Sequence, residues 1–202
     1  MGGGATGEEG SPKGIVPRGI LLVEIPPGEI PRWIAPTCYA VLTLFLFREF
    51  VFSDQMLYGS DTMGLGYMAR AFFANALRTT GFPLWNPVLL GGTPFIESLA
   101  GGDSLYPPSL LLLLVMDTYR AVGWKLVLHV FLAGVFMHAW LRMLGVSRAG
   151  ALVGGIAYLL TPALVTLVFP GNDGKLMVTA LAPLLFWAVE WIFRRRDLLP
   201  LA

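Results

Sequence analysis

The run AVGWKLVLHVFLAGVFMHAWL, residues 121–141, decides the fold class of this chain. Lys125 is the only Asp, Glu, Lys or Arg within it. An α-helix needs about 20 predominantly apolar residues to cross the hydrocarbon core of a bilayer. The run is long enough for this, and we predict a membrane-spanning helix here.

The composition of the whole chain also favours an integral membrane protein. Of 202 residues, 55% are hydrophobic and 13% are charged, whereas soluble domains carry about 25% charged residues. The mean hydropathy is +0.68. No basic stripe interleaves with aromatic residues, so we expect no nucleic-acid partner. Cys38 is the only cysteine, which excludes an internal disulfide or a cysteine-based metal site.

Further apolar runs cover residues 33–52, 149–169 and 176–193. With residues 121–141 they predict an all-α, polytopic membrane helical bundle of about four transmembrane helices. Residues 1–31 are rich in Gly and Pro and predict a disordered cytoplasmic tail. The apolar run at 105–116 is too short to span and is typical of an interfacial or re-entrant segment.

Basic residues predict the orientation of these spans. Arg142 and Arg148 lie between the second and third spans, and three arginines at 194–196 follow the fourth. The positive-inside rule places both groups and the N-terminus in the cytoplasm. The loop at 53–120 and the loop at 170–175 then share the extracytoplasmic side.

The outer loop carries patterned sequence, which favours a functional role over a plain connection. Within it, residues 61–79 predict an amphipathic helix that ends at Gly81. Its apolar face consists of side chains three and four residues apart, namely Leu65, Met68, Phe72 and Ala76. The helix is expected to lie on the bilayer surface or against the spans.

Acidic residues of the outer loops are the first candidates for chemistry. Asp61 fits either a helix N-cap or a positioned carboxylate that acts as a base or metal ligand. Asp173 fits either a solvated Asn-Asp-Gly turn or a second carboxylate beside Asp61. With Asp103 as a third oxygen donor, the set would suit Mg²⁺ or Mn²⁺.

Lys125 and His129 lie one helical turn apart near the outer end of the second span, so they share one helix face. Ionisable residues at membrane depth are candidates for function, here for holding a lipid-linked phosphate. The structural alternative is a snorkelling lysine and a hydrogen-bonded core histidine. The motifs of P-loop ATPases, HExxH zinc proteases and GxSxG hydrolases are absent from the sequence.

Several short motifs carry a family resemblance. They are YMAR at 67–70, FPLWNP at 82–87, GGTP at 91–94, LYPP at 105–108 and YLLTP at 158–162. Their order resembles the bacterial YfhO-like membrane proteins over residues 31–202. More remotely, the chain is similar to the GT-C glycosyltransferases, which use polyprenyl-phosphate sugars.

The resemblance implies a location and a set of roles. It implies a multi-pass protein of the bacterial inner membrane, of which residues 32–202 would be the N-terminal part. The essential acidic residue of the first outer loop falls on Asp61, with Asp173 as a looser match. No second acidic residue adjoins Asp61, which leaves metal dependence open. The donor phosphate would be held by cationic and polar side chains, namely Arg70, Arg78, Lys125, His129 and Lys175.

The expected function is transfer of a sugar from a polyprenyl-phosphate donor to a cell-envelope acceptor on the outer face. Membrane lipid and the lipid-linked sugar are the expected partners. The alternative is a non-enzymatic transporter or envelope-assembly protein whose outer loop binds a partner. The sequence leaves the sugar, the acceptor and the oligomeric state open.

Overall fold

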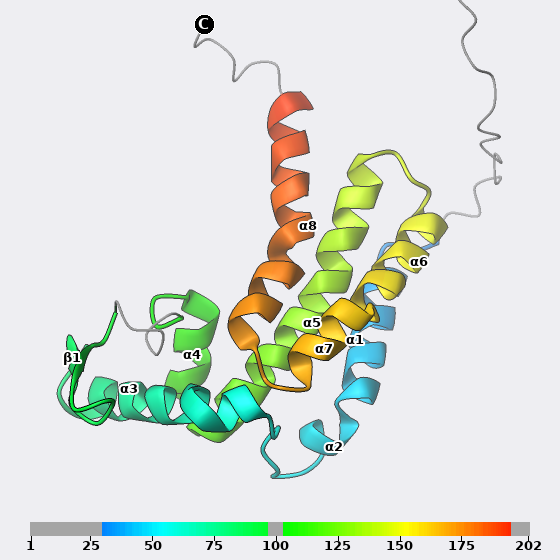
Figure 1. The fold of residues 1–202 in the computed structure, drawn as a ribbon. Helices are drawn as coiled ribbons and strands as arrows, with labels where there is room; N and C mark the ends of the chain where they lie inside the picture. The colour runs from blue at the N-terminus through cyan, green and yellow to red at the C-terminus, as the bar shows by residue number, and fades with distance from the viewer. Residues whose placement is uncertain (1–29, 97–102, 195–202) are drawn as a thin grey trace, which may run out of the picture.

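The computed structural model describes residues 30–96 and 103–194, and these are mostly helical, as predicted for an all-α membrane helical bundle (Figure 1). Apart from Ile30 and Pro31, the predicted tail at 1–31 lies outside the described residues. In chain order the elements are α1 Ile34–Leu46, α2 Arg48–Val51, the π-helical turn η1 Thr62–Gly66, α3 Tyr67–Thr79, β1 Trp85–Asn86, β2 Thr93–Pro94, α4 Pro107–Val115, α5 Thr118–Met143, α6 Arg148–Leu159, α7 Pro162–Val168 and α8 Asp173–Arg194.

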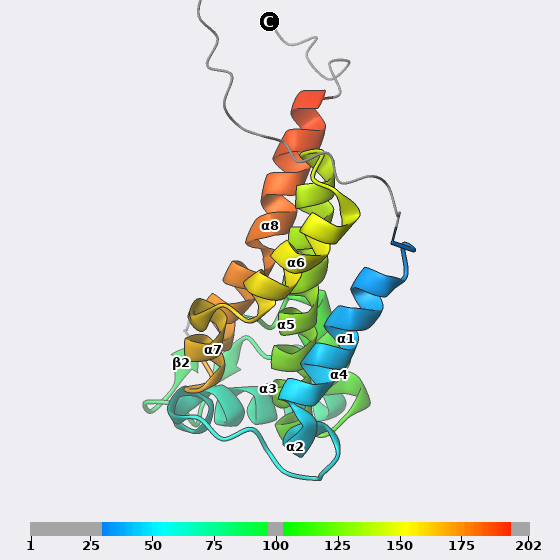
Figure 2. The same cartoon turned by 90° about the vertical axis from the view of Figure 1, so that its right-hand side faces the viewer.

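Helix α5 is the centre of the molecule, because it packs against α1, α3, α4, α6 and α8 (Figures 1 and 2). Small residues let neighbouring helices approach it closely, as is common between membrane helices. A Cβ added to Gly155 of α6 would lie 2.2 Å from the Tyr39 hydroxyl of α1. A Cβ added to Gly134 of α5 would lie 2.9 Å from a Leu159 methyl group.

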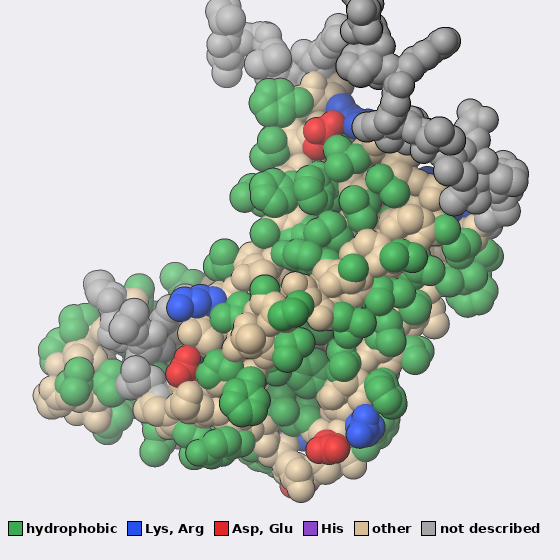
Figure 3. Space-filling view, turned by 45° about the vertical axis from the view of Figure 1, so that its right-hand side comes forward, with side chains coloured by type: hydrophobic (Ala, Val, Ile, Leu, Met, Phe, Trp, Pro, Cys, Tyr) green, Lys and Arg blue, Asp and Glu red, His purple; other side chains and the backbone are tan. Residues whose placement is uncertain are grey.

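Three helical segments are long and apolar enough to cross a membrane: Thr118–Met143, Arg148–Val168 and Asp173–Arg194. The second is interrupted where Pro162 begins α7. On the face of the bundle shown in Figure 3, apolar side chains predominate and charged side chains are sparse. Exposed examples on α6, α7 and α8 are Val153, Val165 and Val178. This surface suits lipid rather than water.

The span predicted at 33–52 is divided. Helix α1 has 13 residues, which is about 20 Å at 1.5 Å per residue, less than the roughly 30 Å hydrocarbon core. Phe47 leaves helical geometry (φ −101°, ψ 18°), and α2 follows. Arg120 at the start of α5 holds α2 in place, with Nη1 donating to the Phe50 carbonyl at 2.8 Å and the guanidinium 4.0 Å from the Phe50 ring centroid.

The predicted amphipathic helix is present as η1 and α3, which lie across one end of the bundle (Figures 1 and 2). Its buried face matches the predicted one only in part. Ala76 is buried and Phe72 is half-buried, but Met68 is exposed. Phe73, which is outside the predicted face, is buried. Phe73 stacks on Phe95 with ring centroids 5.1 Å apart. Gly81 ends the helix with φ +94° and donates from its N–H to the Ala76 carbonyl at 2.8 Å, as predicted.

Segments that the sequence analysis predicted to lie on the same side of the membrane lie at the same end of the bundle. Arg148, after the α5–α6 connection, donates from Nη1 to the Ile30 carbonyl at 3.1 Å, so this connection and the start of the described chain share one end. At the other end, the Asp61 N–H donates to the Pro170 carbonyl at 2.9 Å. Helix α4 has nine residues and is too short to span, as predicted.

Candidate functional site

Four charged side chains from separate parts of the chain meet at the end of the bundle that carries α3. This charge cluster consists of Arg70 of α3, Asp103 before α4, Lys125 of α5 and Asp173 of α8. Lys125 Nζ lies 2.5 Å from Oδ2 of Asp103 and 2.5 Å from Oδ2 of Asp173. Arg70 Nη2 lies 2.9 Å from Asp103 Oδ1 and 2.7 Å from Asp173 Oδ2. Each cation contacts both carboxylates, so the four formal charges cancel.

The charge cluster is largely shielded from solvent. The side chains of Lys125 and Asp103 are 2% and 6% exposed, and those of Arg70 and Asp173 are 12% and 16% exposed. The space beside Arg70, Asp103 and Lys125 is too small to admit a water molecule. Burial of a charge is unfavourable unless the charge is paired, and here each charge is.

Electrostatics keep Asp103 ionised. Burial disfavours its charged form, but the charges of Lys125 and Arg70 outweigh burial and lower its pKa from 3.8 to about 2. The Asp103 contacts are therefore salt bridges at neutral pH. They join the segment before α4 to both α3 and α5.

His129 lies one turn from Lys125 on α5 and is fully buried. Its Nδ1 lies 2.7 Å from the Lys125 carbonyl oxygen, which can only accept, so Nδ1 carries the hydrogen. In the neutral ring Nε2 is then an acceptor, and it lies 2.8 Å from the Tyr106 hydroxyl. Burial raises the pKa of Tyr106, so its hydroxyl stays protonated and donates. Both ring nitrogens of His129 are thus used within the protein, as in the structural alternative.

Asp61 lies outside the charge cluster, and its side chain is exposed. The N-cap interpretation is wrong, because this side chain makes no capping hydrogen bond to η1. A capping residue usually has extended backbone, but Asp61 is helical (φ −73°, ψ −34°). Its Oδ2 instead accepts from Asn172 Nδ2 at 3.2 Å, and its Oδ1 accepts from Ser60 Oγ at 3.3 Å.

The predicted meeting of the two loops is found, and two glycines permit it. A Cβ on Gly59 would lie 2.4 Å from the Pro170 carbonyl oxygen, and a Cβ on Gly171 would lie 1.8 Å from Thr62 Oγ1. The backbone of Gly171 also has φ +78°, a value that residues other than glycine rarely adopt. The loop at 170–172 therefore packs directly on the start of η1. The Asp61 and Asp173 side chains nevertheless have different hydrogen-bonding partners.

The two remaining predicted cations lie in different places. Lys175 is exposed on the first turn of α8, and its backbone N–H donates to Asn172 Oδ1 at 3.3 Å. Asp61 and Lys175 are therefore linked through the two ends of one amide side chain. Arg78 instead donates from Nη2 to the Leu113 carbonyl at 2.9 Å, near the C-terminal end of α4. It takes no part in the salt bridges of the charge cluster.

The three carboxylates predicted as metal ligands do not form one ligand set. Asp103 and Asp173 contact cations, and Asp61 bonds to an amide. Within residues 30–96 and 103–194, no three His, Cys, Asp or Glu side chains are arranged to hold a metal ion.

Two residues of this region escaped the sequence reasoning. Asn172 was treated only as part of a turn, although its amide bridges Asp61 and the start of α8. Tyr106 lies in the apolar run at 105–116, which the sequence indicates only as interfacial or re-entrant, although its hydroxyl contacts His129. For Asn172, the one indication in the sequence was its position next to the candidate carboxylate Asp173. The second contact joins residues 23 positions apart and has no local pattern.

Comparison with known proteins gives no family assignment: no family model, curated protein or solved structure matches this chain.

Proposed function

We propose that this chain belongs to a glycosyltransferase-like protein of the bacterial cell membrane, and that Asp61 is its catalytic base. The observation that carries the proposal is the exposed Asp61 carboxylate, held by the Asn172 amide between η1 and α8. A general base must be accessible to its substrate and fixed in position. Asp61 meets both conditions, and the π-helical turn that follows it is a feature frequent at functional sites.

The proposed reaction transfers a sugar from polyprenyl phosphate to an acceptor hydroxyl. The acceptor oxygen bonds to the anomeric carbon, the bond from that carbon to the phosphate oxygen breaks, and the hydroxyl proton passes to Asp61. The leaving phosphate gains negative charge as this bond breaks, and a fixed cation nearby stabilises it. Lys175 is exposed on the same edge and is the cation that we assign to this role.

The charge cluster acts in this proposal by positioning. Arg70 Nη1 donates to the Gly66 carbonyl at 2.9 Å, at the end of the π-helical turn. Arg70 also contacts Asp173, which adjoins Asn172. The cluster therefore fixes both segments that hold Asp61. Arg70 and Lys125, which the sequence assigned to phosphate binding, are positioning residues here because their charges are already paired.

A non-enzymatic membrane protein is the second candidate, and the same cluster favours it. Its four charges are paired, and the space beside Arg70, Asp103 and Lys125 is too small for a water molecule. Such a network suits a scaffold that presents the outer segments to a partner. In this candidate Asp61 would be a surface carboxylate with no chemical role.

An activity assay separates the two candidates. The protein is expressed in membranes, supplied with polyprenyl-phosphate sugars in a lipid extract, and assayed for loss of the donor. We expect Asp61→Asn to lower turnover by about 10²–10⁴-fold, the usual contribution of general acid–base catalysis. Asp117→Asn is the matched control, since Asp117 is an exposed carboxylate at the start of α5.

The glycosyltransferase proposal fails if Asp61→Asn and Asp117→Asn retain equal donor turnover. It also fails if the wild-type protein consumes no polyprenyl-phosphate sugar. Lys175→Gln adds a second test, because loss of a phosphate contact should weaken use of the donor while Asp61 remains in place. The thermal unfolding temperature of each variant is measured in parallel to exclude unfolding as the cause.

A further inference from the structure

Helix α8 contains a proline near its middle, and another helix replaces the hydrogen bond that this proline cannot make. Pro183 has no N–H, so it cannot donate to the carbonyl oxygen four residues earlier, which belongs to Thr179. The Tyr158 hydroxyl of α6 donates to this same oxygen at 2.7 Å. The freed carbonyl therefore has a partner within a candidate membrane span, where an unsatisfied carbonyl would be costly.

The two halves of α8 are held unequally. The half before Pro183, residues 173–182, begins at Asp173 in the charge cluster and contains two buried residues. In the turns that follow Pro183, none of residues 184–189 is buried. Buried ion pairs are costly to break, so the half that precedes Pro183 is the fixed one.

The half after Pro183 contacts α5 through an aromatic pair. Phe186 lies against Trp140, with ring centroids 5.1 Å apart. Such a contact is weaker than a buried ion pair and is compatible with several ring geometries. Figure 1 shows the C-terminal end of α8 apart from α6, although Tyr158 and Thr179 are in contact. The two helices therefore diverge from this contact toward the end of the bundle opposite Asp61.

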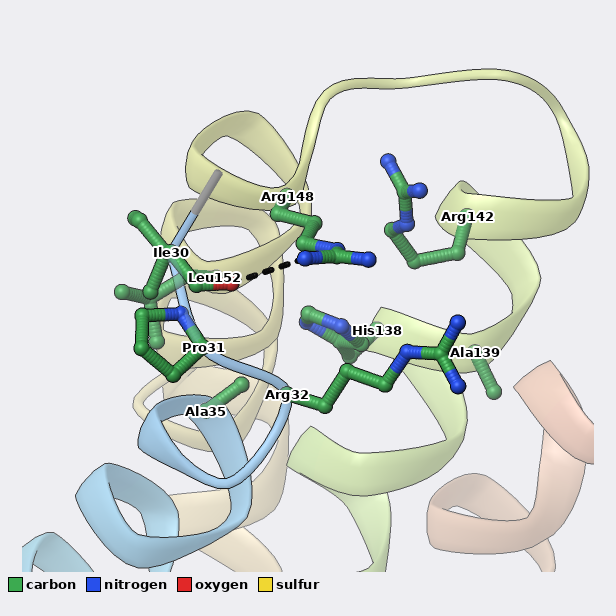
Figure 4. Close-up of a pocket in the computed structure, with 9 residues that line it drawn as sticks. All are labelled: Ile30, Pro31, Arg32, Ala35, His138, Ala139, Arg142, Arg148 and Leu152. Carbon is green, nitrogen blue, oxygen red and sulfur yellow. Dashed lines mark hydrogen bonds between the residues drawn. The ribbon is translucent and has the colours of Figure 1, made fainter. Parts of the chain in front are cut away.

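Helix α6 is tied to α1 at that end of the bundle. Arg148 Nη1 donates to the Ile30 carbonyl at 3.1 Å, which is the dashed line in Figure 4. The Tyr39 hydroxyl of α1 lies 3.3 Å and 3.2 Å from the carbonyl oxygens of Ala151 and Leu152. These contacts make α1 and α6 a reference against which movement of α8 can be measured.

We propose that Pro183 is a hinge, at which the second half of α8 changes its angle to α5 while the first half stays fixed. Hinge residues absorb a change of backbone angles between two rigid parts. A proline suits this role because bending at Pro183 breaks no hydrogen bond to Thr179. The Tyr158 hydroxyl keeps the Thr179 carbonyl satisfied as the angle changes. Asn172 and Asp173 stay in place, so the hinge is independent of the proposed function and is compatible with either candidate.

Distances between spin labels test the hinge in the full chain, reconstituted in nanodiscs after Cys38 is replaced by alanine. Val41→Cys on α1 is paired either with Val178→Cys, before the hinge, or with Val189→Cys, after it. The three sites are 61%, 72% and 43% exposed. We expect a wider distribution of distances for the pair with 189 than for the pair with 178. Equal widths would mean that the second half of α8 is as fixed as the first, and the proposal would fail.

Pro183→Ala restores a backbone N–H that can donate to the Thr179 carbonyl. We expect it to narrow the distribution for the pair 41 and 189 to the width found for the pair 41 and 178. Pro162→Ala is the matched control, because Pro162 begins α7 and lies outside α8. The hinge is not at Pro183 if its replacement leaves the distribution as wide as before, or if Pro162→Ala narrows it equally.

Tyr158→Phe tests the replacement hydrogen bond. Loss of one hydrogen bond should raise the unfolding equilibrium constant about fivefold. The same substitution should have a smaller effect together with Pro183→Ala, because the restored N–H then supplies a donor to Thr179. Equal effects in the two backgrounds would show that the tyrosine and the proline do not act on one carbonyl, which would overturn the proposal. The distance measurement on the protein with Tyr158 and Pro183 intact does not depend on whether these variants fold.

Discussion

Lys125 of α5 and Asp173 of α8 form an ion pair at the end of the bundle, with Nζ 2.5 Å from Oδ2. The same carboxylate oxygen lies 2.7 Å from Arg70 Nη2 of α3. Two candidate spans and the helix that crosses their ends are thereby joined at one atom. Because Asp173 follows Asn172 directly, the pair also fixes the amide that bonds Asp61. The buried salt bridges and the exposed Asp61 carboxylate are therefore connected through adjacent residues of α8 and the loop before it.

We expect removal of one charge from this network to destabilise the protein strongly. Asp103→Asn leaves Arg70 and Lys125 with a single carboxylate in a largely shielded site. Breaking a buried pair in this way costs roughly 3–5 kcal/mol of unfolding free energy. Unfolding in mixed micelles, followed by circular dichroism, measures the change.

The control for this substitution is Glu190→Gln, which removes the partly exposed partner of the exposed Arg194 on α8. An exposed helix pair contributes about 0–1 kcal/mol, so this variant should unfold close to the wild type. Equal losses in the two variants would show that the buried network carries no special stability.

The stability contributed by Asp103 should depend on pH in a defined window. Its pKa is lowered from 3.8 to about 2 in the folded protein. A depressed folded-state pKa stabilises the protein above the unfolded value, and this contribution is lost as the pH falls through the folded value. At about 1.4 kcal/mol per pKa unit, the contribution is about 2 kcal/mol at neutral pH.

The measurement compares wild type and Asp103→Asn between pH 7 and pH 2. The difference in unfolding free energy should be constant above about pH 5 and should shrink as the pH falls from about 4 toward 2. The comparison cancels the titration of groups that both proteins share. A difference that stays constant over the whole range would contradict the assigned pKa.

Some features of this region follow from sequence because they are local or compositional. The apolar length of α5, the helix at 61–79 and its end at Gly81 depend on composition, spacing and one glycine. The meeting of the loops at 61 and 170 follows from a charge rule together with short connections. The features of α5 and of the helix at 61–79 depend on neighbouring residues, whereas the meeting of the loops depends on basic residues in the other connections.

Other features depend on three-dimensional packing that the sequence pattern does not contain. Lys125 and Asp103 were assigned to separate ligands, but the fold places them in one salt-bridge network. Met68 belongs to the apolar pattern of α3, yet the stacked Phe73–Phe95 pair selects a face that leaves Met68 exposed. The break at Phe47 has no Gly or Pro beside it, and Arg120, distant in sequence, contacts the helix beyond it.

Close packing of the outer loops should make Gly59 intolerant of a side chain. A Cβ at this position would lie 2.4 Å from the Pro170 carbonyl oxygen, so Gly59→Ala must separate the two loops. We expect a loss of about 1–3 kcal/mol, the usual cost of overpacking, and faster proteolysis within residues 53–96. Gly64→Ala is the control, because a Cβ there meets no atom within 4 Å. Equal protease sensitivity of the two variants would argue against tight loop contact.

The placement of the two ends of the bundle across a membrane is the remaining prediction. Arg142, Arg148 and Arg194 lie toward one end, and the connection with Asp61 lies at the other (Figure 1). Short basic loops favour the cytoplasm, so the Asp61 end should be extracytoplasmic. Cysteines introduced at Val88 and Leu144, which are 75% and 44% exposed, report on the two ends. Cys38 is first replaced by alanine so that each protein has a single thiol.

In intact cells, a membrane-impermeant maleimide should label the cysteine at 88 and should label the cysteine at 144 only after permeabilisation. If both cysteines are labelled from outside, the two ends of the bundle do not lie on opposite sides of the membrane. Labelling of 144 alone would reverse the orientation and put Asp61 in the cytoplasm. A polyprenyl-phosphate sugar presented on the outer face could not then reach Asp61, so this one assay also constrains the proposed reaction.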